Sequence, residues 1–170
     1  MKRIYAGLST INATLQKSEK FLGCLALAAL FFIMIANATL RYLFSSGLNW
    51  SDELNGFLFV WFGFLAAAYA MSNQAHLNIT ALTNLLPTTV QLGLRVIMNG
   101  IMLAMFIIYL PPLDRLIKTL PIANVMRFPL KYVYIILPIS FTLMCYHITF
   151  NTIRDIRQVW IERQGTEENQ

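Results

Sequence analysis

Long apolar segments alternate with short polar segments along the chain. Four of the apolar segments contain no acidic residue, and each approaches or exceeds the roughly 20 helical residues that cross a hydrocarbon core about 30 Å thick. These segments comprise residues 21–43, 54–71, 92–110 and 132–150. The pattern therefore predicts four transmembrane helices.

Two of the polar segments carry apolar residues at helical spacing. Before the first span the spacing is i, i+4, i+7 and i+11, at Ile4, Leu8, Ile11 and Leu15. It predicts an amphipathic helix over residues 1–20 that lies on the cytoplasmic membrane surface, and a polar extension of the first span is the alternative. A similar stripe between spans two and three predicts a second surface helix that ends near Pro87. Its members are Ala75, Ile79, Leu82 and Leu86.

Turn formers and prolines set the expected boundaries. Residues 45–47, Ser-Ser-Gly, predict a tight turn that makes spans one and two an antiparallel hairpin. Pro111 and Pro112 are expected to end the third span and to open the longest loop. Pro138 falls inside the fourth span, where it predicts a kink and a freed carbonyl that a neighbour or water must satisfy. Residues 154–170 are expected to form a polar cytoplasmic tail, without regular structure after Arg163.

The composition excludes an ordinary soluble domain. The 170 residues are 57% hydrophobic and 12% charged, whereas soluble domains are about 25% charged. We therefore expect an all-α integral membrane protein, with four transmembrane helices in one domain over residues 21–153 and short interfacial amphipathic helices. The first apolar run is too long for a signal-peptide core, so we expect a retained anchor. Cys24 and Cys145 lie in different apolar runs, which favours a packing role for both.

The distribution of basic residues predicts the orientation. With four spans, both termini lie on the same side of the membrane. That side holds eight basic residues and the other side holds five. The eight include Arg95, whose long side chain would have to extend from the start of its span to the membrane surface. The eight are Lys2, Arg3, Lys17, Lys20, Arg95, Arg154, Arg157 and Arg163, and the five are Arg41, Arg115, Lys118, Arg127 and Lys131. The bias favours cytoplasmic termini. Because these residues sit at helix ends, membrane headgroups explain them better than nucleic acid does.

The spans carry little that could perform chemistry. Their central parts lack ionisable residues and hold only mild polar groups, for which we expect interhelical or backbone hydrogen bonds: Asn37, Thr39, Asn99, Ser140 and Thr142. His76 is expected at headgroup level and His147 at a helix end, so no histidine pair is placed to bind haem. No motif predicts catalytic residues, a metal site or a cofactor, and we do not expect an enzyme.

Small residues recur in helical register on two spans. Gly56, Gly63, Ala67 and Ala70 share a face of the second span, and Gly93, Gly100 and Ala104 share one of the third. Such faces allow close backbone approach, which drives helix association in lipid. Either the two spans pack on one another, or one face docks a larger membrane protein.

An acidic pair stands directly before the second span. Asp52 and Glu53 follow Trp50 and occupy the first turn of the predicted helix, where the helix dipole favours negative charge. Their position at the membrane rim argues against a proton or ion site. The pair could instead bind Arg41 across the short loop, or the acids and Trp50 could contact a partner protein. Of these interactions, we expect the ion pair with Arg41.

These motifs together resemble the small membrane subunit, the DctQ-type or Q subunit, of tripartite ATP-independent periplasmic (TRAP) transporters. The resemblance rests on Trp50 with the acidic pair, a central glycine, the segment from His76 to Pro87, and residues 131–138 of the fourth span. Ser72 and Thr80 depart from the family, which often has Arg and Asp at these places. Their joint loss suggests that these charges normally pair.

The resemblance implies a sodium-driven uptake system for organic acids in the bacterial inner membrane. Its partners would be a large multi-span transport subunit, the M subunit, and a periplasmic substrate-binding protein. This chain would be a scaffold that stabilises the large subunit and helps dock the binding protein. Residues 82–87 look most like members that move sialic acid, whereas dicarboxylates are prominent family substrates.

Two functions of other classes compete with this hypothesis. A self-sufficient small transporter or channel would need an acidic residue embedded in the membrane, and none lies away from the span ends. A cytochrome-type membrane anchor would need paired histidines at matching depth.

Overall fold

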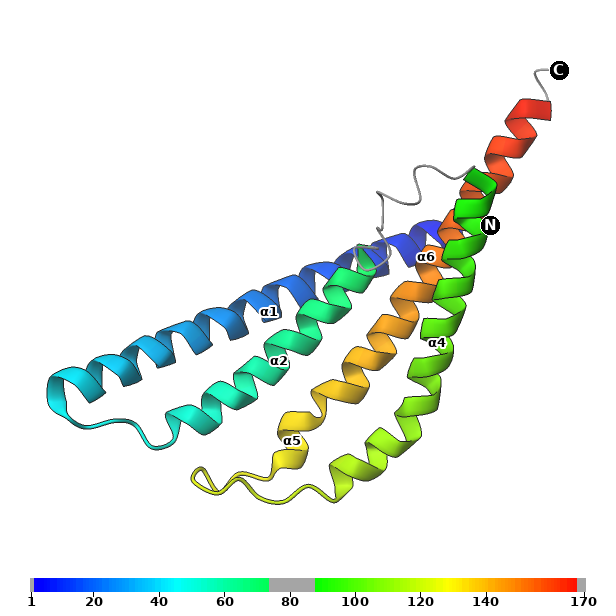
Figure 1. Ribbon diagram of the computed structural model, residues 1–170. Helices are drawn as coiled ribbons and strands as arrows, with labels where there is room; N and C mark the ends of the chain where they lie inside the picture. The colour runs from blue at the N-terminus through cyan, green and yellow to red at the C-terminus, as the bar shows by residue number, and fades with distance from the viewer. Residues whose placement is uncertain (1, 74–87, 168–170) are drawn as a thin grey trace.

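The protein is built from helices in the part that the computed structural model describes, residues 2–73 and 88–167 (Figure 1). The helices are α1 (Lys2–Phe44), α2 (Ser51–Ser72), α4 (Thr88–Lys118), α5 (Leu130–Tyr134) and α6 (Ile136–Glu167). Four segments are long and apolar enough to cross a membrane: Gly7–Phe44, Ser51–Ser72, Gly93–Lys118 and Leu130–Arg157. The prediction of an all-α fold with four membrane-spanning helices is confirmed.

The amphipathic segment at the N-terminus and the first span form one helix. α1 continues through Lys20 and Phe21 without a break and reaches Phe44. It contains no proline, and at 1.5 Å per residue its length is about 64 Å. The location of residues 2–20 relative to the membrane surface stays a prediction, and the second expected surface helix lies outside the described residues.

Two expected helix ends are wrong. α4 continues through Pro111 and Pro112 to Lys118, although each proline removes one backbone hydrogen bond. The residues after Pro112 are mostly good helix formers, and Lys118 pairs with Asp114 one turn before it at 2.6 Å, so the helix continues despite the two missing bonds. The connection to α5 is therefore shorter than expected. At the other end of the chain, α6 is helical to Glu167, beyond Arg163.

Pro138 has the expected effect on the fourth span. The span is interrupted at Ile135, which separates α5 from α6. The Nε1–H group of Trp61 on α2 donates a hydrogen bond of 2.9 Å to the carbonyl of Val133, beside this break. The carbonyl that Pro138 leaves without its helical donor is that of Tyr134, so the bond from Trp61 satisfies its neighbour, and satisfaction of the freed carbonyl stays a prediction.

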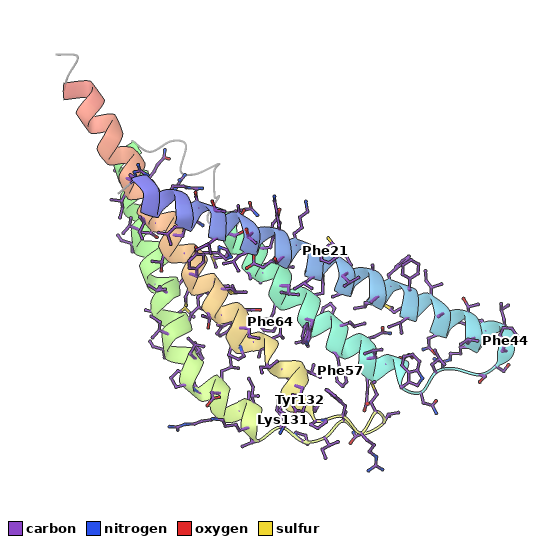
Figure 2. The ribbon with its side chains drawn as sticks, turned by 180° about the vertical axis from the view of Figure 1, so that it is seen from behind. Phe21, Phe44, Phe57, Phe64, Lys131 and Tyr132 are labelled. Atoms are coloured by element: carbon purple, nitrogen blue, oxygen red, sulfur yellow. The ribbon has the colours of Figure 1, made fainter. Side chains whose placement is uncertain are left out.

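α6 is the central helix of the bundle. It packs against α2 on one side and α4 on the other, while α1 packs against α2 (Figure 1). Phe141 of α6 contacts Phe64 of α2 and Phe106 of α4, with ring centroids 6.2 and 5.1 Å apart, respectively. Figure 2 shows Phe64 on the side of α2 that faces α6. The buried core next to this aromatic row consists of Ala68, Met71, Met144 and Ile148.

Both termini lie at one end of the bundle (Figure 1). We call this the terminal end. The opposite end, which carries the α1–α2 loop and the connection between α4 and α5, is called the loop end.

Candidate functional site

A buried polar clasp joins α1 to α6. His147 is 0% exposed, and its two ring nitrogens lie 2.8 Å from Oδ1 of Asn12 and 2.8 Å from Oε1 of Glu19. Asn12 and Glu19 are 7% and 3% exposed, respectively. The expectation that His147 lies at a helix end is wrong, because α6 continues for five more turns and the imidazole points into the bundle. We call Asn12, Glu19 and His147 the polar clasp.

Each ring nitrogen of His147 takes part in one hydrogen bond, and the direction of each bond depends on the tautomer. The bond between Nε2 and Glu19 runs from Nε2–H to a carboxylate or from a protonated carboxyl group to Nε2. Nδ1 either donates to the amide oxygen of Asn12 or accepts from the amide nitrogen of a turned Asn12 side chain. In both cases Glu19 and His147 form a direct interhelical bond.

Further polar contacts connect the clasp region to the end of α2. The side-chain amide of Asn151 on α6 donates to the carbonyls of Met71 and Ser72, at 3.2 and 3.3 Å. Gln16 on α1 donates to the same Ser72 carbonyl at 3.5 Å. These bonds satisfy carbonyls that have no partner within the last turn of a helix.

Sequence reasoning missed this polar cluster, although its spacing was visible. His147, Asn151 and Asp155 recur at i, i+4 and i+8 on α6, and all three are buried. Asn12, Gln16 and Glu19 recur at i, i+4 and i+7 on α1. Two polar stripes at helical spacing indicate two helix faces that pair with each other.

The mild polar residues of the spans mostly form the expected hydrogen bonds. Oδ1 of Asn37 accepts from the backbone N–H of Leu48 at 2.8 Å, which fixes the α1–α2 loop. Asn99 donates to Thr152 at 2.8 Å and so links α4 to α6. Thr142 donates to the carbonyl of Pro138 in its own helix. Ser140 is buried, and no partner of its hydroxyl is recorded among the described residues.

The small-residue faces of α2 and α4 do not meet, because α6 lies between these helices. A Cβ atom added at any of four glycines would meet no atom within 4 Å: Gly56, Gly63, Gly93 and Gly100. Ala104 is exposed, and Ala67 and Ala70 are half-buried. Packing of α2 on α4 is therefore not the role of these faces, and a role in docking stays a proposal.

The acidic pair does not bind Arg41 in the described part of the chain. Glu53 instead accepts two backbone N–H groups of the connection between α4 and α5, from Val125 at 2.9 Å and from Met126 at 2.8 Å. Both carboxylate oxygens are thus used in charge-assisted bonds to a fixed backbone. An ion pair with the exposed Arg41 would have to immobilise two side chains, so the backbone partners are preferred.

The remaining candidate positions are surface residues or are not described. Trp50 and Asp52 are exposed at the loop end. His76 and Thr80 lie outside the described residues. Within the described ranges, no three His, Cys, Asp or Glu side chains are grouped to hold a metal ion, and Cys24 and Cys145 are not bonded to each other. The arrangement is one of helix packing, with polar groups that bond to one another across the helices.

Comparison with known proteins identifies the family. A profile of the tripartite ATP-independent periplasmic transporters, DctQ component, matches residues 30–158. A TRAP transporter small permease protein of Haemophilus influenzae is 37% identical over 81 residues, which make up 47% of this chain and 50% of that protein.

Two further relatives match over similar lengths. A sialic acid TRAP transporter permease protein of Haemophilus influenzae is 40% identical over 77 residues, 45% of this chain and 12% of that protein. The C4-dicarboxylate TRAP transporter small permease protein of Vibrio cholerae is 29% identical over 69 residues, 41% of this chain and 30% of that protein. The matches thus span half or less of each relative. The profile, in contrast, covers most of this chain, which therefore belongs to the DctQ-component family of tripartite ATP-independent periplasmic (TRAP) transporters.

Proposed function

We propose that this chain is a non-enzymatic scaffold subunit of a sodium-driven TRAP transporter for an organic acid, such as sialic acid or a dicarboxylate. It holds a large multi-span transport subunit in the bacterial inner membrane and helps to dock a periplasmic substrate-binding protein. The observation that carries this proposal is the set of glycine positions on α2 and α4 that no part of the described bundle covers.

The polar side chains of the bundle bond to other groups of the same chain, which supports a scaffold function and not a carrier function. A carrier needs polar or ionisable groups that line a path for its substrate. Here Glu19 and His147 bond to each other, and Asn37 and Asn99 also bond within the chain. These groups hold helices together, which suits a rigid support.

The exposed glycines suit a protein partner. In lipid, helices associate through close packing, and small residues allow two backbones to approach. Gly56 and Gly63 on α2, and Gly93 and Gly100 on α4, offer such a surface. The sialic acid permease relative supports this view, because the matched region forms 12% of that protein. A segment like this chain is thus a small part of a larger permease.

We place the termini in the cytoplasm and the loop end at the periplasmic face. The excess of Lys and Arg on the side of the termini supports this orientation. The loop end then presents Trp50 and Asp52 towards the periplasm, where a binding protein would dock.

The experiment is purification in mild detergent with the large subunit, followed by sodium-dependent uptake in liposomes with and without this chain. We expect little uptake by the large subunit alone and restored uptake by the complex. Equal uptake in both preparations would refute the scaffold function.

A pair of substitutions separates assembly from folding. Gly63→Leu places its side chain in open space, so it should leave the fold of this chain intact and weaken the complex on size exclusion. Ala68→Leu is the matched control, because Ala68 is 0% exposed and an added side chain would overpack the core of the bundle itself. An unchanged complex with Gly63→Leu would remove this face from the interface.

A further inference from the structure

The connection between α4 and α5 is an ordered hairpin. The N–H group of Ala123 donates to the carbonyl of Phe128 at 2.9 Å, and that of Leu130 donates to the carbonyl of Pro121 at 3.2 Å. Ile122 and Pro129 form an antiparallel bridge between these bonds. We call residues 121–130 the hairpin. These two backbone hydrogen bonds give the hairpin a defined shape, unlike that of a free loop.

Glu53 fixes the hairpin to the first turn of α2. Its two carboxylate oxygens accept the adjacent N–H groups of Val125 and Met126 at the tip. Both views show the hairpin reaching across from α4 and α5 towards the start of α2 (Figures 1 and 2). The tip is therefore held at the level of this turn.

The hairpin exposes apolar side chains. Ile122, Val125, Met126 and Phe128 are 39 to 58% exposed, and we call them the hairpin patch. Clustered apolar side chains at the surface usually mark a contact with a protein or a membrane. About half of the surface of these side chains is left uncovered by the described bundle.

The level of the hairpin coincides with the membrane boundary. α2 has 22 residues and a length of about 33 Å, close to the hydrocarbon thickness of about 30 Å. Its first turn, which Glu53 occupies, thus lies at one edge of the hydrocarbon core. A hairpin bound to that turn lies in the interfacial layer and not far out in water.

Charges and aromatic rings around the hairpin match a lipid surface. Arg127 belongs to the hairpin, and Lys131 follows it and lies 5.1 Å from the ring of Tyr132 (Figure 2). The ring of Phe128 packs against the same ring at a tilt of 49°, with centroids 5.7 Å apart. Basic and aromatic side chains together are typical of the headgroup layer, where phosphates attract cations. Of the nearby acids, Glu53 is already bound to the hairpin backbone.

We propose that the hairpin patch inserts into the membrane leaflet at the loop end, with Arg127 and Lys131 at the phosphates of anionic phospholipids. The hairpin then anchors the α4–α5 side of the bundle at a fixed depth. This inference requires only that the bundle spans a membrane, so it stands or fails separately from the scaffold function and the substrate.

The test uses a depth probe at the tip of the hairpin. Cys24→Ala and Cys145→Ala remove the native thiols, and Val125→Cys carries an NBD fluorophore, in vesicles of phosphatidylethanolamine and phosphatidylglycerol without partner proteins. We expect quenching by nitroxide-labelled phospholipids at a depth of about 5–10 Å and protection from aqueous iodide. Ser46→Cys in the other loop at this end is the control, for which we expect free access of iodide.

Two outcomes would overturn the inference. Iodide could reach position 125 as readily as position 46, which would place the hairpin in water. Alternatively, protection could arise only when the large subunit or the binding protein is added, which would make the patch a protein-docking surface. Phe128→Cys provides a second labelling position if labelled Val125→Cys does not fold.

A further variant tests the part played by Glu53. Glu53→Ala removes both bonds to the tip, so we expect weaker quenching by the nitroxide lipids at position 125. Asp52→Asn is the matched control, because Asp52 is exposed and lies one position before Glu53. Equal quenching in both variants would show that Glu53 does not set the depth of the hairpin.

Discussion

Removal of His147 should destabilise the bundle strongly, because the imidazole is the recorded partner of two buried groups. In His147→Phe the ring volume is largely kept, but Asn12 and Glu19 lose bonds of 2.8 Å each. The second carboxylate oxygen of Glu19 is also buried and has no recorded partner. The substitution thus leaves a buried carboxyl group without the bond to His147.

The expected magnitude follows from the nature of this bond. Two neutral interhelical hydrogen bonds would contribute about 1.2 kcal/mol, at an average of about 0.6 kcal/mol each in membrane proteins. Loss of one partner of a buried ion pair costs about 3–5 kcal/mol. Even between neutral groups, each buried group left without a partner costs about 1–3 kcal/mol. Because Asn12 and Glu19 are both buried, we expect a loss of stability of about 2 kcal/mol or more for His147→Phe.

The assay is unfolding by a titration with denaturing detergent, followed by tryptophan fluorescence. Glu19→Gln keeps the size of the side chain and a carbonyl acceptor for Nε2–H, so it should destabilise less than His147→Phe. The double variant Glu19→Met with His147→Phe removes both ends of the bond and should be more stable than His147→Phe alone. The buried Glu19–His147 bond would be refuted if His147→Phe lowered the free energy of unfolding by less than about 1 kcal/mol. It would also be refuted if the double variant were no more stable than His147→Phe.

Other predictions concern the remaining interhelical contacts. Trp61→Phe removes the bond to the Val133 carbonyl at the α5–α6 break and should destabilise by about 1–2 kcal/mol in the same titration; an unchanged midpoint would contradict this. Glu53→Ala should speed hydrogen exchange of the Val125 and Met126 amides, which Glu53 binds, whereas Asp52→Asn should leave their exchange unchanged. Equal exchange rates in the two variants would argue against the observed bonds. Ala68→Leu should destabilise by about 1–3 kcal/mol, because its Cβ is fully enclosed; a neutral effect would indicate a looser core.

The sequence predicts which segments form helices, but it does not predict where all of these helices end. Runs of apolar residues predict spans because each span must bury its own backbone polar groups in lipid. α4 nevertheless continues through Pro111 and Pro112, where the usual rule predicts an end, because good helix formers and the Asp114–Lys118 pair follow them. Pro138 does interrupt its helix, and Trp61 is placed to bond beside the break. Whether a helix continues through a proline also depends on the residues that pack around it in the folded bundle, and the local sequence does not reveal them.

The partner of the acidic pair could not be derived from local spacing. Arg41 and Glu53 are close in the sequence and face the same short loop, which made an ion pair plausible. The actual partners, the amides of Val125 and Met126, are about seventy residues away. They become available only because the hairpin folds over the first turn of α2. A tertiary contact of this kind depends on the path of a loop, and hydrophobic periodicity carries no information about that path.

The polar clasp, in contrast, was within reach of sequence reasoning. Depth in the span alone predicts a helix-end position for His147 and indicates no role for Glu19, which precedes the first apolar run. Helical spacing is the better guide, because Asn12, Gln16 and Glu19 form one stripe and His147 begins another. The polar stripe on α6 lies in a span, where it is too costly to face lipid and should face another helix. The stripe on α1 precedes the first apolar run, where polar groups can also face water, so the sequence indicates this contact only from the side of α6.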